Sequence, residues 1–137
     1  MIGFGKRVLA GNEMAAMRQF LAEVLEQQGF TMVRACDGVQ ALCELQQRHV
    51  DVVVTDYHMP RLNGLDLLRQ SQMVWPEIPV IFFSDLERDT EGLTQARGAF
   101  AWIRQSSDPG ILLSMLTLAV EHGAEWEPRR ATEWVGV

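Results

Sequence analysis

Residues 50–60, with the sequence Val-Asp-Val-Val-Val-Thr-Asp-Tyr-His-Met-Pro, most strongly constrain what this chain can fold into. A short run of β-branched residues ends here in a carboxylate, which a proline-containing loop follows. Such a run, bounded by turn residues, is typical of a central parallel strand that is buried on both faces. The strand would deliver Asp56 to its carboxyl end, where open α/β sheets place their chemistry. The alternative for an isolated aspartate is that it only caps a loop, so the rest of the chain has to decide.

Four further apolar runs alternate with stretches of helical periodicity. The additional strands are predicted at residues 6–10, 30–35, 78–83 and 99–104. The helices are predicted from Met14 to Gly29, after Asp37, after Asn63-Gly64, over 86–97 and after Asp108-Pro109. The alternation of the two kinds of element indicates βαβ units.

The helical spacing and the turn residues also predict individual positions. Met14 and Met17 are expected to fill the core in the first helix, and Met73 is expected to face inward near the end of the third. Asp37 is predicted to cap the second helix, with Gln40 in the reciprocal position of a capping box.

Five strands alternating with five helices predict right-handed crossovers and a doubly wound parallel sheet. The simplest arrangement is the flavodoxin-like strand order 2-1-3-4-5, whose topological switch lies between the first and third strands. Asn12, Glu13 and Asp56 are therefore expected to converge on one crevice, flanked by Ser84 and Gln105.

Composition excludes several classes of protein. A net charge of −6 with only 12 lysines and arginines argues against nucleic-acid binding, which needs a basic surface. No stretch approaches the roughly 20 apolar residues of a membrane span, and the N-terminus has no signal-peptide pattern. Cys36 and Cys43 are too few for a disulfide framework and are predicted to be reduced, largely buried thiols. We expect a cytoplasmic protein with one domain over residues 1–122 and a C-terminal extension or linker start over 123–137.

Asp56-Tyr57-His58-Met59-Pro60 is followed by Gly64, which gives the pattern D-x-x-M-P-x-x-x-G. With this pattern, residues 5–122 resemble the receiver domain of two-component response regulators, whose fold is the flavodoxin-like (CheY-like) one. Further similar stretches are Asp37-Gly38, Pro79-Val80-Ile81 leading to Ser84, and Gly98-Ala99.

The resemblance implies a phosphoprotein of a two-component phosphorelay, in which Asp56 takes a phosphoryl group from a histidine kinase or a phosphotransfer protein and the affinity for partners then changes. It implies a Mg²⁺ ion held by Glu13, Asp56 and the backbone carbonyl of His58, with Asn12 binding weakly or through water. Ser84 would be the switch hydroxyl, and Trp102 would be the aromatic residue that changes rotamer with it. The domain would not be an enzyme beyond catalysing its own phosphorylation and dephosphorylation. The resemblance also allows a homodimer through the fourth helix, fifth strand and fifth helix.

Two positions depart from the family pattern. Asn12 replaces one of the usual acidic residues, which predicts weak Mg²⁺ binding, and Gln105 occupies the position of the usual lysine. A unit charge about 4 Å from a carboxylate is worth about 4 kcal/mol at an effective dielectric of about 20, so the loss of the lysine is large. A second hypothesis is therefore a degenerate receiver that binds a partner or itself without phosphate.

Hypotheses from other classes have less support. A phosphotransferase or phosphatase of the aspartyl-phosphate kind would place a second acid two residues after the nucleophile, where this chain has His58. A flavin-binding protein would need a phosphate loop rich in hydroxyl groups and glycine after the first strand, where Gly11-Asn12-Glu13 stands instead.

Overall fold

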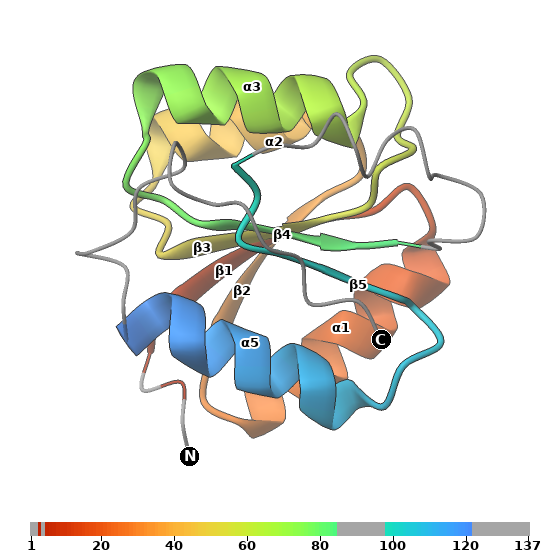
Figure 1. Ribbon diagram of the computed structural model, residues 1–137. Helices are drawn as coiled ribbons and strands as arrows, with labels where there is room; N and C mark the ends of the chain where they lie inside the picture. Colours follow the sequence, from red (N-terminus) through yellow and green to blue (C-terminus); the bar gives the residue numbers. More distant parts are fainter. Residues whose placement is uncertain (1–2, 4, 85–97, 122–137) are drawn as a thin grey trace.

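A five-stranded parallel sheet forms the centre of the protein (Figure 1). The structure, a computed structural model, describes residues 3, 5–84 and 98–121. The strands are β1 (Arg7–Gly11), β2 (Thr31–Ala35), β3 (Val52–Thr55), β4 (Val80–Phe83) and β5 (Ala101–Ile103). Their order in the sheet is β2-β1-β3-β4-β5, which confirms the predicted topology.

Four described helices pack on the two faces of this sheet. They are α1 (Ala15–Gln27), α2 (Gly38–Gln47), α3 (Gly64–Val74) and α5 (Pro109–Glu121). In Figure 1, α2 and α3 cover one face, and α1 and α5 cover the other. The helix predicted over 86–97 and the extension predicted over 123–137 lie outside the described residues. No helix in the described part of the chain is long and apolar enough to cross a membrane.

The core is divided by the sheet into two layers. Strand β3 serves both: Val53 packs with the residues under α2 and α3, whereas Val52 and Val54 pack with those under α1 and α5. All four residues of β3 are buried, as the run of valines predicts for a central parallel strand. The strand that carries Asp56 at its end is therefore held on both faces.

Three of the helix termini carry the side chains that the sequence places there. Asp37 caps α2 by accepting a hydrogen bond from the Gln40 backbone N–H, and Asn63 caps α3 by accepting one from Asp66. Gln40 also bonds backward, but to the backbone N–H of Cys36, one residue before the cap. The predicted reciprocal bond therefore forms with a neighbouring donor. At the start of α5, the Asp108 side chain accepts from the Gly110 backbone N–H.

Several predicted burials are wrong. Met14 is 62% exposed because it is the N-cap residue of α1 and precedes the buried stripe of that helix. Met73 is 83% exposed because it follows the buried Leu68 by five residues, which turns it about 140° away from the core-facing side of α3. Both cysteines are free, as predicted, but both are exposed. Cys36 lies in the connection before α2, and Cys43 lies on the solvent side of that helix.

Candidate functional site

The carboxyl ends of β1 and β3 lie side by side at one edge of the sheet. Gly11 is in register with Thr55, and the Asp56 backbone N–H donates to the Gly11 carbonyl oxygen at 3.0 Å. Asn12 directly follows β1 and Asp56 directly follows β3, so these two residues leave neighbouring strands at the same edge. Strands β2 and β3 lie on opposite sides of β1, so the chain crosses over β1 between them. The carboxyl ends of β1 and β3 therefore form the topological switch point of the sheet.

The Asp56 side chain is fixed by a partner from the next strand. The Ser84 hydroxyl, just past the end of β4, donates to Asp56 Oδ1 at 2.8 Å. Burial of the carboxyl group raises the pKa of Asp56 above its ordinary value. The Ser84 hydrogen bond opposes this rise, as do the backbone N–H groups of Tyr57 and His58 and the charge of His58. Asp56 is half-buried and Ser84 is buried, so the carboxylate is oriented without being sealed from solvent.

The loop after Asp56 makes a close turn that only a glycine at position 64 permits. The Gly64 backbone N–H donates to the Tyr57 carbonyl oxygen at 2.7 Å, and the Thr55 hydroxyl donates to the Asp56 carbonyl oxygen at 2.9 Å. A Cβ atom on Gly64 would stand 2.3 Å from the Asp56 carbonyl oxygen. The glycine of the sequence motif is thus required by the approach of α3 to the end of β3.

Asn12 is tied into the start of α1. It is only 2% exposed, its Oδ1 accepts from the Met14 backbone N–H at 2.9 Å, and its carbonyl oxygen accepts from Arg18 Nη1 at 2.7 Å. Glu13, by contrast, is exposed. Of the two residues predicted as the metal-binding pair after β1, one therefore has its side-chain oxygen engaged by a backbone N–H just before α1.

Gln105 reaches back to the end of β4. Its Nε2 donates to the Phe83 carbonyl oxygen at 3.0 Å, next to Ser84 in the chain. The side chain at the position of the usual lysine is thus held at the same edge of the sheet, with its amide bound to a backbone carbonyl.

Trp102 lies inside the core and has no exposed surface. Its ring stacks on Phe82, with centroids 4.9 Å apart, and on Tyr57, with centroids 5.7 Å apart. Tyr57 follows Asp56 directly. The aromatic stack therefore joins the interior of β5 to the loop that begins at Asp56.

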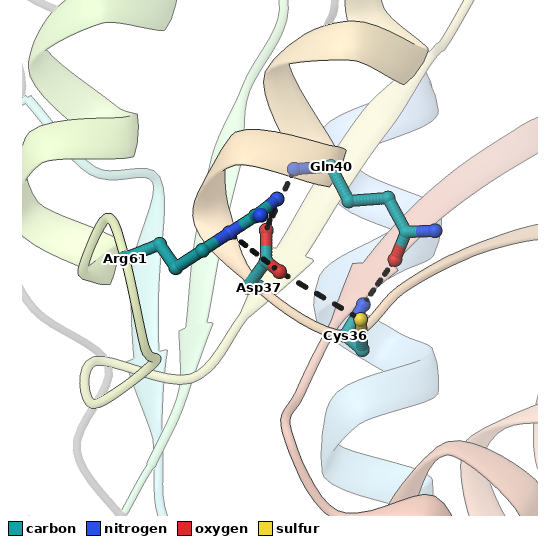
Figure 2. A network of polar contacts seen from close by, with 4 residues as sticks. All are labelled: Cys36, Asp37, Gln40 and Arg61. Atoms are coloured by element: carbon teal, nitrogen blue, oxygen red, sulfur yellow. Dashed lines mark hydrogen bonds and ion pairs between the residues drawn. The ribbon is translucent and has the colours of Figure 1, made fainter.

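The sequence reasoning missed a polar network at the far end of that loop. Arg61 Nε lies 3.1 Å from Asp37 Oδ2, and Arg61 Nη2 donates to Asp37 Oδ1 at 3.4 Å (Figure 2). Asp37 was predicted only as a helix cap. The two residues are 24 positions apart, and no local pattern in the sequence links an arginine in this loop to the cap of α2.

The donor set fits a Mg²⁺ ion with few protein ligands. Among the described residues, no three histidine, cysteine, aspartate or glutamate side chains are grouped as a metal site. Mg²⁺ is commonly held by one or two carboxylates, waters and a phosphate, and the half-buried Asp56 oxygen is a ligand of the right hardness. The residues at this edge therefore suit an ion that depends on water and phosphate for most of its coordination.

Comparison with known proteins gives the same family from sequence and from structure. The family model for the response regulator receiver domain matches residues 8–117. The CAI-1 autoinducer sensor kinase/phosphatase CqsS of Vibrio cholerae is 33% identical over 113 residues, which cover 80% of this chain and 16% of the kinase. The transcriptional regulatory protein PdtaR of Mycobacterium tuberculosis is 32% identical over 124 residues, covering 88% of this chain and 59% of that protein.

Solved structures agree with this match. The signal receiver domain of an HD domain-containing protein from Pseudomonas fluorescens Pf-5 has a TM-score of 0.84 and 25% identity, and the match covers 88% of this chain and 98% of that domain. The chain thus corresponds to nearly all of a solved receiver domain, but spans less than two thirds of the length of the two curated relatives.

Proposed function

This chain belongs to the response regulator receiver family, and from that membership we propose that Asp56 accepts a phosphoryl group from a histidine kinase or a phosphotransfer protein. One observation carries the proposal. The Asp56 carboxylate is half-buried at the carboxyl edge of the parallel sheet, with the Ser84 hydroxyl 2.8 Å from Oδ1. A nucleophilic oxygen is therefore oriented and still accessible.

In this phosphoryl transfer, the attacking Asp56 oxygen is the one protein group of this domain that forms a covalent bond. An Asp56 oxygen attacks the phosphorus of a phosphohistidine, the P–N bond breaks, and the phosphoryl group is transferred with its three oxygens to form an acyl phosphate. The Ser84 hydroxyl, which now donates to the carboxylate, would then donate to a phosphoryl oxygen. A bound Mg²⁺ would screen the negative charges of carboxylate and phosphate. Asp56, Glu13 and the His58 backbone carbonyl are the proposed ligands, with Asn12 acting weakly or through water.

Phosphorylation of Asp56 would transmit a signal by changing the affinity of this domain for a partner protein. We propose that Trp102 transmits the change, because its ring stacks on Tyr57, the residue after Asp56. Strand β5 and helix α5 belong to the proposed homodimer face. The chain is a signalling module that at most catalyses the formation and loss of its own acyl phosphate.

The experiment that tests the proposal measures binding of beryllofluoride, a phosphoryl mimic, with Mg²⁺ by two-dimensional NMR. We expect shifts at Ser84 and Trp102 at millimolar concentrations of both, and their loss in the D56N variant. The D66N variant, altered at a carboxylate in the first turn of α3, should respond like the wild type. A small phosphodonor such as acetyl phosphate should modify the wild type but not D56N, as read from intact mass.

Absence of both responses would contradict the proposal and favour a second candidate, a phosphate-independent interaction module. Two contacts support that candidate. Asn12 Oδ1 is engaged by the Met14 backbone N–H and Gln105 Nε2 is bound to the Phe83 carbonyl, so both amide groups, which carry no charge, already have partners within the protein.

A further inference from the structure

The loop between Asp56 and α3 is anchored on the first turn of α2 by a two-point ion pair. Arg61 contacts both carboxylate oxygens of Asp37, through Nε at 3.1 Å and Nη2 at 3.4 Å (Figure 2). The planar guanidinium group matches a carboxylate in this way, so the contact fixes orientation as well as distance.

Asp37 contacts both helix α2 and the loop that contains Arg61. Asp37 is 8% exposed, and its Oδ1 also accepts from the Gln40 backbone N–H at 2.8 Å as the cap of α2. The Arg61 side chain is 61% exposed and comes from an irregular segment. The carboxylate is thus the fixed end of the pair, and the loop is the end that gains order.

The backbone around Arg61 needs such an anchor. Arg61 has a φ of 68°, the left-handed conformation that residues with a branched or long side chain rarely adopt. The loop also packs directly on α2, because a Cβ atom on Gly38 would stand 2.1 Å from the Leu62 carbonyl oxygen. Unfavourable backbone conformations persist where surrounding contacts determine the path of the chain, and the ion pair and this packing are such contacts.

We propose that Arg61 is a positioning residue, whose ion pair with Asp37 fixes the path of loop 57–63 and thereby places the backbone of Tyr57 and His58 beside Asp56. Both ends of the loop are already tied. The backbone N–H groups of Tyr57 and His58 lie where they lower the pKa of the Asp56 carboxyl group, and the Gly64 N–H donates to the Tyr57 carbonyl at 2.7 Å. The consequence for phosphoryl uptake rests on the function proposed above, whereas the placement of the loop does not.

Three variants test the proposal in the full chain. R61N removes the ion pair but keeps a residue that tolerates the left-handed backbone. D37N removes the same ion pair but keeps a side chain that caps α2. The double variant D37N/R61N completes a thermodynamic cycle, in which two changes that break one interaction are not additive.

The first readout is amide hydrogen exchange at Gly64, which reports the loop directly. We expect exchange there to become about three- to tenfold faster in each single variant, with little further change in the double variant. Exchange in β1 and β3 should stay as in the wild type. The second readout is the concentration of beryllofluoride and Mg²⁺ needed for half-saturation, which we expect to rise about threefold in each variant.

Two results would overturn the proposal. Unchanged exchange at Gly64 in both single variants would mean that the ion pair does not hold the loop. Equal acceleration at all amides would mean that the pair supports only global stability. If the wild type fails to bind beryllofluoride, the proposed function fails, but exchange at Gly64 still decides whether Arg61 positions the loop.

Discussion

The Ser84 hydroxyl donates a hydrogen bond to Asp56 Oδ1 at 2.8 Å, although the two residues are 28 positions apart in the sequence. They meet because β3 and β4 are parallel neighbours that end at the same edge of the sheet. The hydroxyl stabilises the charged form of a carboxyl group whose burial favours the neutral form. This opposition between burial and hydrogen bonding makes Asp56 sensitive to changes in its neighbours.

Removal of the hydroxyl in S84A should raise the pKa of Asp56 further, because the ionised carboxylate loses a donor. The carboxyl carbon of Asp56, followed by NMR through a pH titration, measures this directly. Binding of beryllofluoride should weaken about tenfold, the size expected for a lost hydrogen bond to a charged group. S84T retains a hydroxyl and should stay close to the wild type. A lowered pKa in S84A would contradict the assigned role of Ser84.

Neutralising Asp56 should stabilise the fold at pH 7. The pKa of Asp56 is raised in the folded state above its ordinary value of 3.8. The contribution of this group to the free energy of unfolding is therefore complete below pH 3.8 and is lost as the pH rises through the pKa of the folded state. D56N should therefore have a larger free energy of unfolding than the wild type at pH 7, and the gap should narrow toward pH 3.8. Urea unfolding of both proteins between pH 3.8 and pH 7 measures this difference in the free energy of unfolding. D66N should not stabilise the protein, because Asp66 lies in the first turn of α3, where negative charge is favourable.

The sequence was sufficient for the parts of the fold that local patterns determine. The valine run of β3 predicted a buried central strand, Asp37 predicted a helix cap that the structure contains, and Asn63-Gly64 predicted the start of α3. Strand order followed from the alternation of elements and the handedness of crossovers. That order, in turn, predicted that Asn12 and Asp56 leave neighbouring strands at one edge.

Contacts that depend on exact rotation or on distant loops could not be predicted. Met14 and Met73 lie at helix ends, where the periodic pattern no longer fixes which side faces the core. The bond from Gln105 to the Phe83 carbonyl depends on how the chain turns after β5. The pairing of Arg61 with Asp37 depends on a left-handed residue in a loop, which no periodicity reports.

Substitution of Gly64 by alanine should destabilise the protein by about 2 kcal/mol or more. The new Cβ would stand 2.3 Å from the Asp56 carbonyl oxygen and 2.8 Å from Phe82 Cε1, so the end of β3 would have to move. Urea unfolding gives the free energy. The matched control is G110A in the first turn of α5, where the nearest contact is the Asp108 side chain at 3.1 Å and alanine favours the helix. Equal losses in both variants would refute the packing argument.

Introducing a lysine at position 105 should strengthen the site. The Gln105 amide now binds the Phe83 carbonyl beside Ser84, and an ammonium group at this edge would favour the ionised form of Asp56. Q105K should lower the pKa of Asp56 and tighten beryllofluoride binding about tenfold, within the usual range of coupling energies. Q105M, which has similar length but no charge, should not tighten binding. Equal behaviour of Q105K and Q105M would show that the charge does not reach Asp56.

Replacing Asn12 by aspartate should make the stability of the protein depend on Mg²⁺. The new side chain can still accept from the Met14 N–H, as Asn12 Oδ1 does at 2.9 Å, so the start of α1 is preserved. However, position 12 is 2% exposed and adjoins Asp56 at the sheet edge, so a second carboxylate there is unfavourable until a cation neutralises it.

Without metal, N12D should be less stable than the wild type. Added Mg²⁺ should stabilise it more than the wild type, by about 1.4 kcal/mol for each tenfold gain in affinity. Thermal unfolding with EDTA and with Mg²⁺ measures both effects, and N12S, which keeps a side-chain oxygen without charge, should show no added dependence on Mg²⁺. If Mg²⁺ stabilised N12D no more than N12S, position 12 would lie too far from the ion to hold it, and the metal would depend on Asp56 and Glu13 alone.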